Sequence, residues 1–159
     1  MGLFSRKKKE PPAPPAQTVK ASVLVCTNNR NTVEALVPVL EQEHLAIKGI
    51  LWESAEILER YQAIRPDFVM LDNDLNGQDG LEMLRELREA HPGAVVVFLG
   101  TFFESSAQAM VARAITYGAK QILAKNKEGK IPAENIRGCL DKVMDAAAEK
   151  KASELQGDS

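Results

Sequence analysis

The regular alternation of short apolar runs with helical patterns is the feature that most constrains the fold. Five runs of strand length lie at residues 22–26, 47–52, 68–71, 94–99 and 121–124. Each is followed by a segment whose apolar residues recur at three- and four-residue spacing, as in a helix with one buried face. Because parallel strands need a crossover between them, this order predicts a parallel sheet with helices on both faces.

The expected fold class is therefore α/β. Five strand and helix units within residues 21–148 predict a flavodoxin-like (βα)5 three-layer sandwich with the parallel strand order 2-1-3-4-5. The two cysteines, Cys26 and Cys139, fall within these patterns. Two unclustered cysteines predict buried thiols in a reducing cytoplasm, and neither a disulfide framework nor a zinc site.

Two polar segments flank the predicted domain. Residues 1–20 combine a basic tip with a proline-rich run at 10–16 and predict a disordered linker, and residues 149–159 predict a polar C-terminal tail. In the tip, two apolar residues precede four consecutive cations, which leaves two interpretations of residues 2–9 open: a solvated tail or a weak peripheral contact with an anionic membrane. No apolar run reaches membrane-spanning length, so a cytoplasmic protein is expected, with or without that contact.

The charge distribution argues against a nucleic-acid surface. Residues 1–20 carry five Lys or Arg and one Glu, a net charge of +4. The net charge of the whole chain is −2, so residues 21–159 carry −6. An acidic domain repels a phosphate backbone, and no nucleic-acid partner is expected.

The apolar run Phe68–Leu71 delivers one carboxylate, Asp72, to its C-terminal end. The run is apolar at every position, as a central parallel strand covered on both faces must be. A polar loop containing glycine follows it, and a helical pattern begins at Gly80 with Asp79 as its expected cap. Asp72 is thus predicted at the sheet edge where open α/β folds place their chemistry.

Three matches carry a resemblance to the receiver domain of bacterial two-component response regulators, over roughly residues 21–148. The segment Asp72–Gly80 resembles the phosphoacceptor motif of the family, D-x-x-[apolar]-P-x-x-D-G, with Asn76 in place of the usual proline. Gly118-Ala119 is similar to the Gly-Ala pair that precedes the fifth strand of the family. Lys125 then follows at the spacing of the family's lysine.

The resemblance implies a role for each matching residue. Asp72 would be the nucleophile that accepts a phosphoryl group as an acyl phosphate, and Lys125 would pair with the phosphoryl oxygens. The backbone carbonyl of Asp74 would offer a metal ligand beside Asp72. The family's switch hydroxyl aligns with Gly100, so Thr101 is the best candidate for that role.

The resemblance also exposes a departure in the metal site. Receivers hold Mg²⁺ with two acidic residues after the first strand, and this chain has Thr27 and Asn28 there. Mg²⁺ dehydrates reluctantly and prefers anionic oxygen, so we expect it to bind weakly at most, with Asp72, the Asp74 carbonyl and Asn28 as ligands. Without phosphorylation, Asp72 and Lys125 would form an ion pair that serves stability alone.

The function implied by the resemblance is that of a stand-alone receiver in a phosphorelay. Its partner would be a histidine kinase or another signalling protein, and its output would be protein contact, including contact within a homodimer. Self-phosphorylation from a donor would be its only reaction, so the chain is not expected to be an enzyme. One alternative is a pseudo-receiver that docks without phosphorylation. A more distant one is a flavodoxin-like redox protein that binds FMN through loop 27–32, although that loop lacks glycine.

Overall fold

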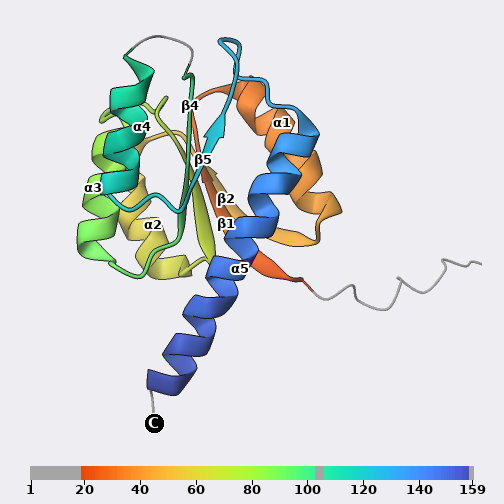
Figure 1. Cartoon of the computed structure of the whole chain (residues 1–159), viewed down its shortest axis with the longest axis vertical. Coiled ribbons are helices and arrows are strands. Elements are labelled where there is room, and N and C mark those ends of the chain that lie inside the picture. Colours follow the sequence, from red (N-terminus) through yellow and green to blue (C-terminus); the bar gives the residue numbers. More distant parts are fainter. Residues whose placement is uncertain (1–18, 103–105, 158–159) are drawn as a thin grey trace, which may run out of the picture.

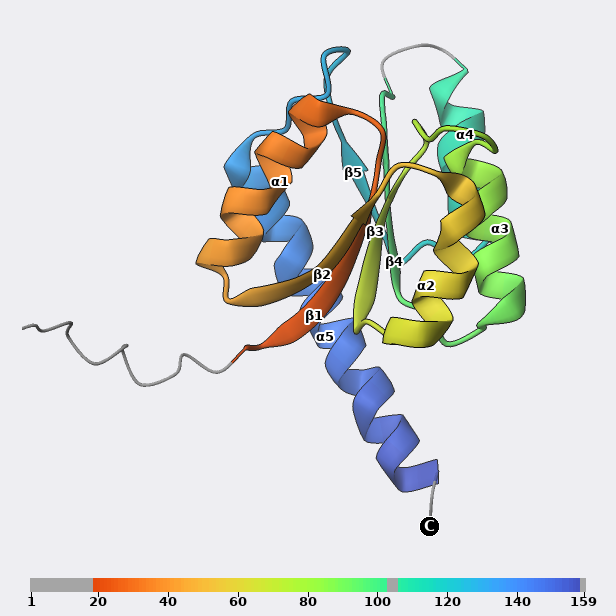
Figure 2. The same ribbon diagram turned by 180° about the vertical axis from the view of Figure 1, so that it is seen from behind.

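The computed structural model of the chain describes residues 19–102 and 106–157. A five-stranded parallel sheet, in the order β2-β1-β3-β4-β5, lies between two layers of helices (Figures 1 and 2). The strands are β1 (Ala21–Cys26), β2 (Leu45–Leu51), β3 (Phe68–Asp72), β4 (Val96–Gly100) and β5 (Gln121–Ala124). The helices are α1 (Arg30–Gln42), the 3₁₀ helix η1 (Ser54–Glu56), α2 (Ile57–Ile64), α3 (Gly80–Ala90), α4 (Ala107–Thr116) and α5 (Ala133–Gly157). The predicted class, layers and strand order are confirmed.

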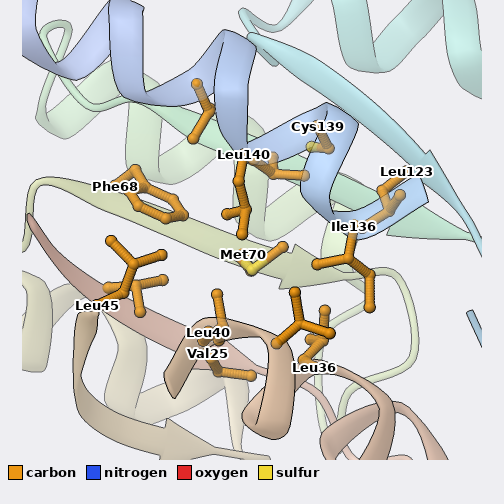
Figure 3. Close-up of a cluster of buried hydrophobic side chains, with 14 of the residues drawn as sticks. Val25, Leu36, Leu40, Leu45, Phe68, Met70, Leu123, Ile136, Cys139 and Leu140 are labelled. Atoms are coloured by element: carbon orange, nitrogen blue, oxygen red, sulfur yellow. The ribbon is translucent and has the colours of Figure 1, made fainter. Parts of the chain in front are cut away.

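The two faces of the sheet are covered by different helices. Helices α1 and α5 pack on one face, and α2, α3 and α4 pack on the other (Figures 1 and 2). Successive residues of β3 alternate between them: Phe68 and Met70 lie in the cluster with α1 and α5, and Val69 and Leu71 lie in the other. Figure 3 shows Phe68 and Met70 among the side chains of the first cluster. Burial on both sides explains why this run is apolar at every position.

Because the strands are parallel, the C-terminal ends of β1, β3 and β5 lie at the same edge of the sheet. Cys26 at the end of β1 pairs with Leu71, and Asp72 at the end of β3 pairs with Leu99 of β4. Thr27 follows β1, and Lys125 follows β5. Segments far apart in the sequence therefore place these polar side chains around the end of β3.

The connection from β3 to α3 packs tightly against the backbone of Asp72. Asp79 caps α3 as predicted, because its carboxylate accepts a hydrogen bond from the Glu82 N–H at 2.9 Å. The next residue, Gly80, has no room for a side chain, because a Cβ at this position would overlap the carbonyl oxygen of Asp72. The first turn of α3 thus depends on a glycine here.

The last helix extends beyond the boundary expected at residue 148. Helix α5 runs without a break to Gly157, so residues 149–157 continue the helix instead of leaving it as a tail. In this part, Lys151 Nζ lies 3.1 Å from Oδ1 of Asp67, which directly precedes β3. Lys150 Nζ lies 3.4 Å from the hydroxyl of Tyr61 in α2. The last helix of the domain and residues 149–157 thus form one continuous helix.

The other flanking predictions fall largely outside the described residues. The basic tip at residues 2–9 and most of the proline-rich linker lie within residues 1–18, which the structure does not describe. Residues 103–105 and 158–159 are also outside it. Within the described ranges, no helix is both long and apolar enough to cross a membrane.

Gly80→Ala should lower the free energy of unfolding by about 2–3 kcal/mol, because the new methyl group must displace the backbone of Asp72. Gly138→Ala is the matched control. Gly138 lies within α5, and a Cβ added to it would meet nothing within 4 Å, so alanine there should raise stability by about 0.5–1 kcal/mol. Urea unfolding followed by circular dichroism measures both changes, and a Gly80→Ala protein as stable as the wild type would contradict the close approach.

Candidate functional site

A buried ion pair lies at the centre of the C-terminal edge of the sheet. Lys125 Nζ lies 2.5 Å from Asp72 Oδ2, and both side chains are only 1% exposed. Asp72 is the last residue of β3, and Lys125 directly follows β5. Strand β4 lies between these two strands in the sheet. A lysine this deeply buried requires a nearby negative charge, and the structure supplies two.

The second negative charge is the side chain of Asp74. Its Oδ2 lies 2.7 Å from Lys125 Nζ, so one ammonium group bridges two carboxylates. Unlike Asp72, the Asp74 side chain is 52% exposed, so this site reaches the protein surface at Asp74. Asp74 enters the site through its carboxylate, in addition to the backbone carbonyl that was predicted.

Thr27 completes the contacts of Asp72. The Thr27 hydroxyl donates a hydrogen bond to Asp72 Oδ2 at 2.6 Å and accepts one from the Asn29 N–H at 3.1 Å. The other carboxylate oxygen, Asp72 Oδ1, accepts the Asp74 N–H at 3.2 Å. Thr27 therefore occupies the place of a family acid and acts as a donor toward Asp72.

Two opposing effects set the proton affinity of Asp72. Burial raises the pKa of its carboxyl above the ordinary value, because the charged form loses its hydration. The hydrogen bond and charge of Lys125, the Thr27 hydroxyl and the Asp74 N–H act in the opposite direction, and they offset only part of the effect of burial. The site thus combines a desolvated carboxylate with a closely held ammonium group.

A chain of hydrogen bonds links the pocket to an exposed tryptophan. The Asn28 N–H donates to the Asp74 carbonyl at 2.9 Å, and the Asn28 amide donates to Asn76 Oδ1 at 3.1 Å. The Asn76 N–H in turn donates to the carbonyl of Trp52 at 2.9 Å. A proline at position 76 would lack this N–H, so the departure from the family motif has a structural use. Trp52 is 56% exposed.

The predicted switch hydroxyl is placed beside β4. Gly100 ends β4, and a Cβ built on it would lie 2.8 Å from the ring of Phe102. The ring therefore lies where a side chain at position 100, which the resemblance aligns with the family's hydroxyl, would otherwise extend. Thr101 is the next residue and is half-buried. In the described part of the chain it makes no hydrogen bond to Asp72 or Lys125, and its switch role stays a prediction.

The response regulator receiver domain family matches residues 23–134, more than half of the chain. The chain belongs to this family, whose members act in two-component signalling. Receiver domains are typically signalling modules without enzymatic activity, and they interact with histidine kinases and other signalling proteins. This match favours the receiver interpretation over a redox protein that binds FMN.

Individual relatives fit the same family. The chain is 26% identical to chemotaxis protein CheY of Thermotoga maritima over 90 residues, which cover 57% of this chain and 72% of CheY. It is 34% identical over 85 residues to a protein-glutamate methylesterase/protein-glutamine glutaminase of Geobacillus kaustophilus. That match covers 54% of this chain and 24% of the relative, so the chain spans about a quarter of the methylesterase.

Solved structures share the fold. The response regulator domain of Thermotoga maritima CheB matches with a TM-score of 0.68 at 19% identity, covering 80% of this chain and 96% of that domain. The signal receiver domain of a modulated diguanylate cyclase from Desulfovibrio desulfuricans G20 matches with a TM-score of 0.67 at 22% identity, covering 84% and 98%. Both comparisons support the flavodoxin-like receiver architecture.

Receiver domains generally bind Mg²⁺ in an acidic pocket, and the donors in this pocket do not fit that ion. Nowhere in residues 19–102 and 106–157 do three His, Cys, Asp or Glu side chains gather to hold a metal. The two carboxylates present, Asp72 and Asp74, both contact Lys125. Thr27 and Asn28 contribute no charge. Mg²⁺ prefers anionic oxygen in a near-ideal octahedron, and this set does not provide it.

The structure brings together most, but not all, of the predicted site residues. Asp72, Lys125 and Asp74 meet directly, and Asn28 joins them through the Asp74 carbonyl. From the sequence, Thr27 was identified only as a residue that replaces an acid, and its hydrogen bond to Asp72 was not predicted. The position of Thr27 directly after β1, the strand beside β3, could have indicated that its hydroxyl lies near Asp72.

Lys125→Met should lower the free energy of unfolding at pH 7 by about 3 kcal/mol, because it leaves the Asp72 carboxylate buried without its ammonium partner. Because the Lys125 contact lowers the pKa of the Asp72 carboxyl, its loss raises that pKa further, and the protonated carboxyl of the variant needs no ammonium partner. The difference in free energy of unfolding between the wild type and the variant should therefore shrink as the pH falls from 7 towards about 3.9, the ordinary pKa of an aspartate. Urea unfolding at several pH values measures this effect.

Lys130→Met is the control for this substitution. Its ammonium lies 4.0 Å from Glu128 with both side chains exposed, so its loss should change stability by less than about 0.5 kcal/mol at any pH. If the loss of stability in Lys125→Met did not vary with pH, the broken ion pair would not be its cause.

Proposed function

We propose that Asp72 is the phosphoacceptor of this receiver domain. The observation that carries the proposal is the contact between the Asp72 carboxylate and Lys125 Nζ at the C-terminal edge of the sheet, at 2.5 Å. This pair supplies the two charges that phosphoryl transfer to an aspartate needs: a nucleophile and a cation for the transferred oxygens. The family match supports the same assignment.

Three side chains of the site, those of Asp72, Lys125 and Thr27, take part in the proposed reaction. An Asp72 oxygen attacks the phosphorus of a phosphorylated donor, and the bond from phosphorus to the leaving group breaks as the acyl phosphate forms. The leaving group departs with the electron pair of that bond. Lys125 offsets the charge of the phosphoryl oxygens, and the Thr27 hydroxyl already points at Asp72 and can donate to the same oxygens.

Signal output is proposed to be protein contact, with a histidine kinase as the phosphoryl donor. The surface of α4, β5 and α5 is the proposed contact face. Ile115 on α4 supports this, because it is 58% exposed and is one of the few large apolar side chains so exposed in the described part of the chain. A homodimer through this face is the simplest such contact.

Phosphorylated protein should sediment faster than unphosphorylated protein if this face forms a dimer. Ile115→Asp should return it to the monomer, because a charge placed in an apolar contact is not compensated there. Gln62→Asp, an exposed position on α2 and outside the proposed face, is the control for added charge. Sedimentation velocity of all three proteins tests the contact, and an unchanged profile for Ile115→Asp would exclude this residue from it.

Incubation with acetyl phosphate should add one phosphoryl group to the wild type, detected by intact mass and by Phos-tag electrophoresis. Asp72→Asn should abolish the gain, because an amide cannot serve as the nucleophile. Asp79→Asn is the matched control, since this carboxylate lies in the same loop but caps α3, and its variant should still be modified. No mass gain at any Mg²⁺ concentration would overturn the proposal.

A further inference from the structure

The two carboxylates of the site, those of Asp72 and Asp74, both contact a cation of the protein itself, the ammonium group of Lys125. Lys125 Nζ lies between Asp72 Oδ2 at 2.5 Å and Asp74 Oδ2 at 2.7 Å. An ammonium group has three N–H donors, and these two contacts engage two of them. Among the described residues no further acceptor contacts this ammonium group, which leaves its third donor for an oxygen of a phosphoryl group.

The oxygen atoms that a metal ion would need are engaged as well. Asp72 Oδ2 accepts from both Lys125 and Thr27, and Asp72 Oδ1 accepts the Asp74 N–H. The Asp74 carbonyl, which the resemblance assigned to the metal, accepts the Asn28 N–H at 2.9 Å. A divalent ion would have to displace several of these contacts and would lie beside a buried ammonium group of like charge.

We propose that Lys125, held by Asp72 and Asp74, takes the place of the divalent cation, so that this receiver is phosphorylated without Mg²⁺. The inference rests on the proposed role of Asp72 and adds the identity of the cation. Asp74 acts as a positioning residue, because its half-exposed carboxylate holds the buried ammonium group through a contact of 2.7 Å. Thr27 and Asn28 are the residues that exclude the metal, since neither brings a negative charge.

Isothermal titration of the full chain with Mn²⁺ and with Mg²⁺ tests the metal claim without any phosphorylation. The wild type should show no binding at millimolar ion, whereas Thr27→Asp/Asn28→Asp should bind at least about tenfold more tightly, because it restores two carboxylates. Adding Asp72→Asn to that double variant should remove the gain and so place the ion in this pocket. Wild-type binding as tight as that of the double variant would overturn the inference.

A second measurement covers the case in which the double variant does not fold. The initial rate of the mass gain from acetyl phosphate is compared for the wild type in EDTA and in excess Mg²⁺. The two rates should agree within about twofold, because Lys125 supplies the cation in both conditions. A gain that requires Mg²⁺ would overturn the inference while leaving Asp72 as the phosphoacceptor. A complete lack of gain would instead overturn the proposed function, and the titration alone would then decide the metal claim.

Discussion

The ion pair between Lys125 and Asp72 is the interaction on which the site depends. It joins the ends of β3 and β5 across the intervening strand β4, with both side chains removed from water. Burying two charges has a large desolvation cost, which a single contact rarely offsets. Here the cost is offset by additional contacts: the Asp74 carboxylate on the ammonium group, and the Thr27 hydroxyl on the Asp72 carboxylate.

The same contacts explain how the pocket can differ from other receivers yet keep their architecture. Thr27 and Asn28, which the resemblance aligns with two acids, bring no negative charge, and the two carboxylates that contact Lys125 are those of Asp72 and Asp74. Asn28 also ties the β1–α1 loop to Asn76 in the β3–α3 loop. The loops around Asp72 are thus joined by neutral hydrogen bonds.

Local patterns were sufficient to predict the elements but not all of their limits. The cap at Asp79 and the strand at Phe68–Leu71 were readable because capping and two-sided burial have local signatures. Helix α5 continues past residue 148, where the sequence predicted the start of a polar tail. Its polar composition at residues 149–157 suggested a tail, whereas helix-forming residues and the contact of Lys151 with Asp67 extend the helix.

The parallel α/β class can be read from the alternation of strands and helices in the amino-acid sequence, and the pairing of Asp72 with Lys125 from the resemblance of their motifs to those of receiver domains. The direction of the Asp74 carboxylate and the role of Thr27 as a donor emerge from the folded structure alone. They depend on contacts between residues 51 and 45 positions apart. Side-chain direction at such separations is set by packing and hydrogen-bond geometry around the pocket, which no local pattern encodes.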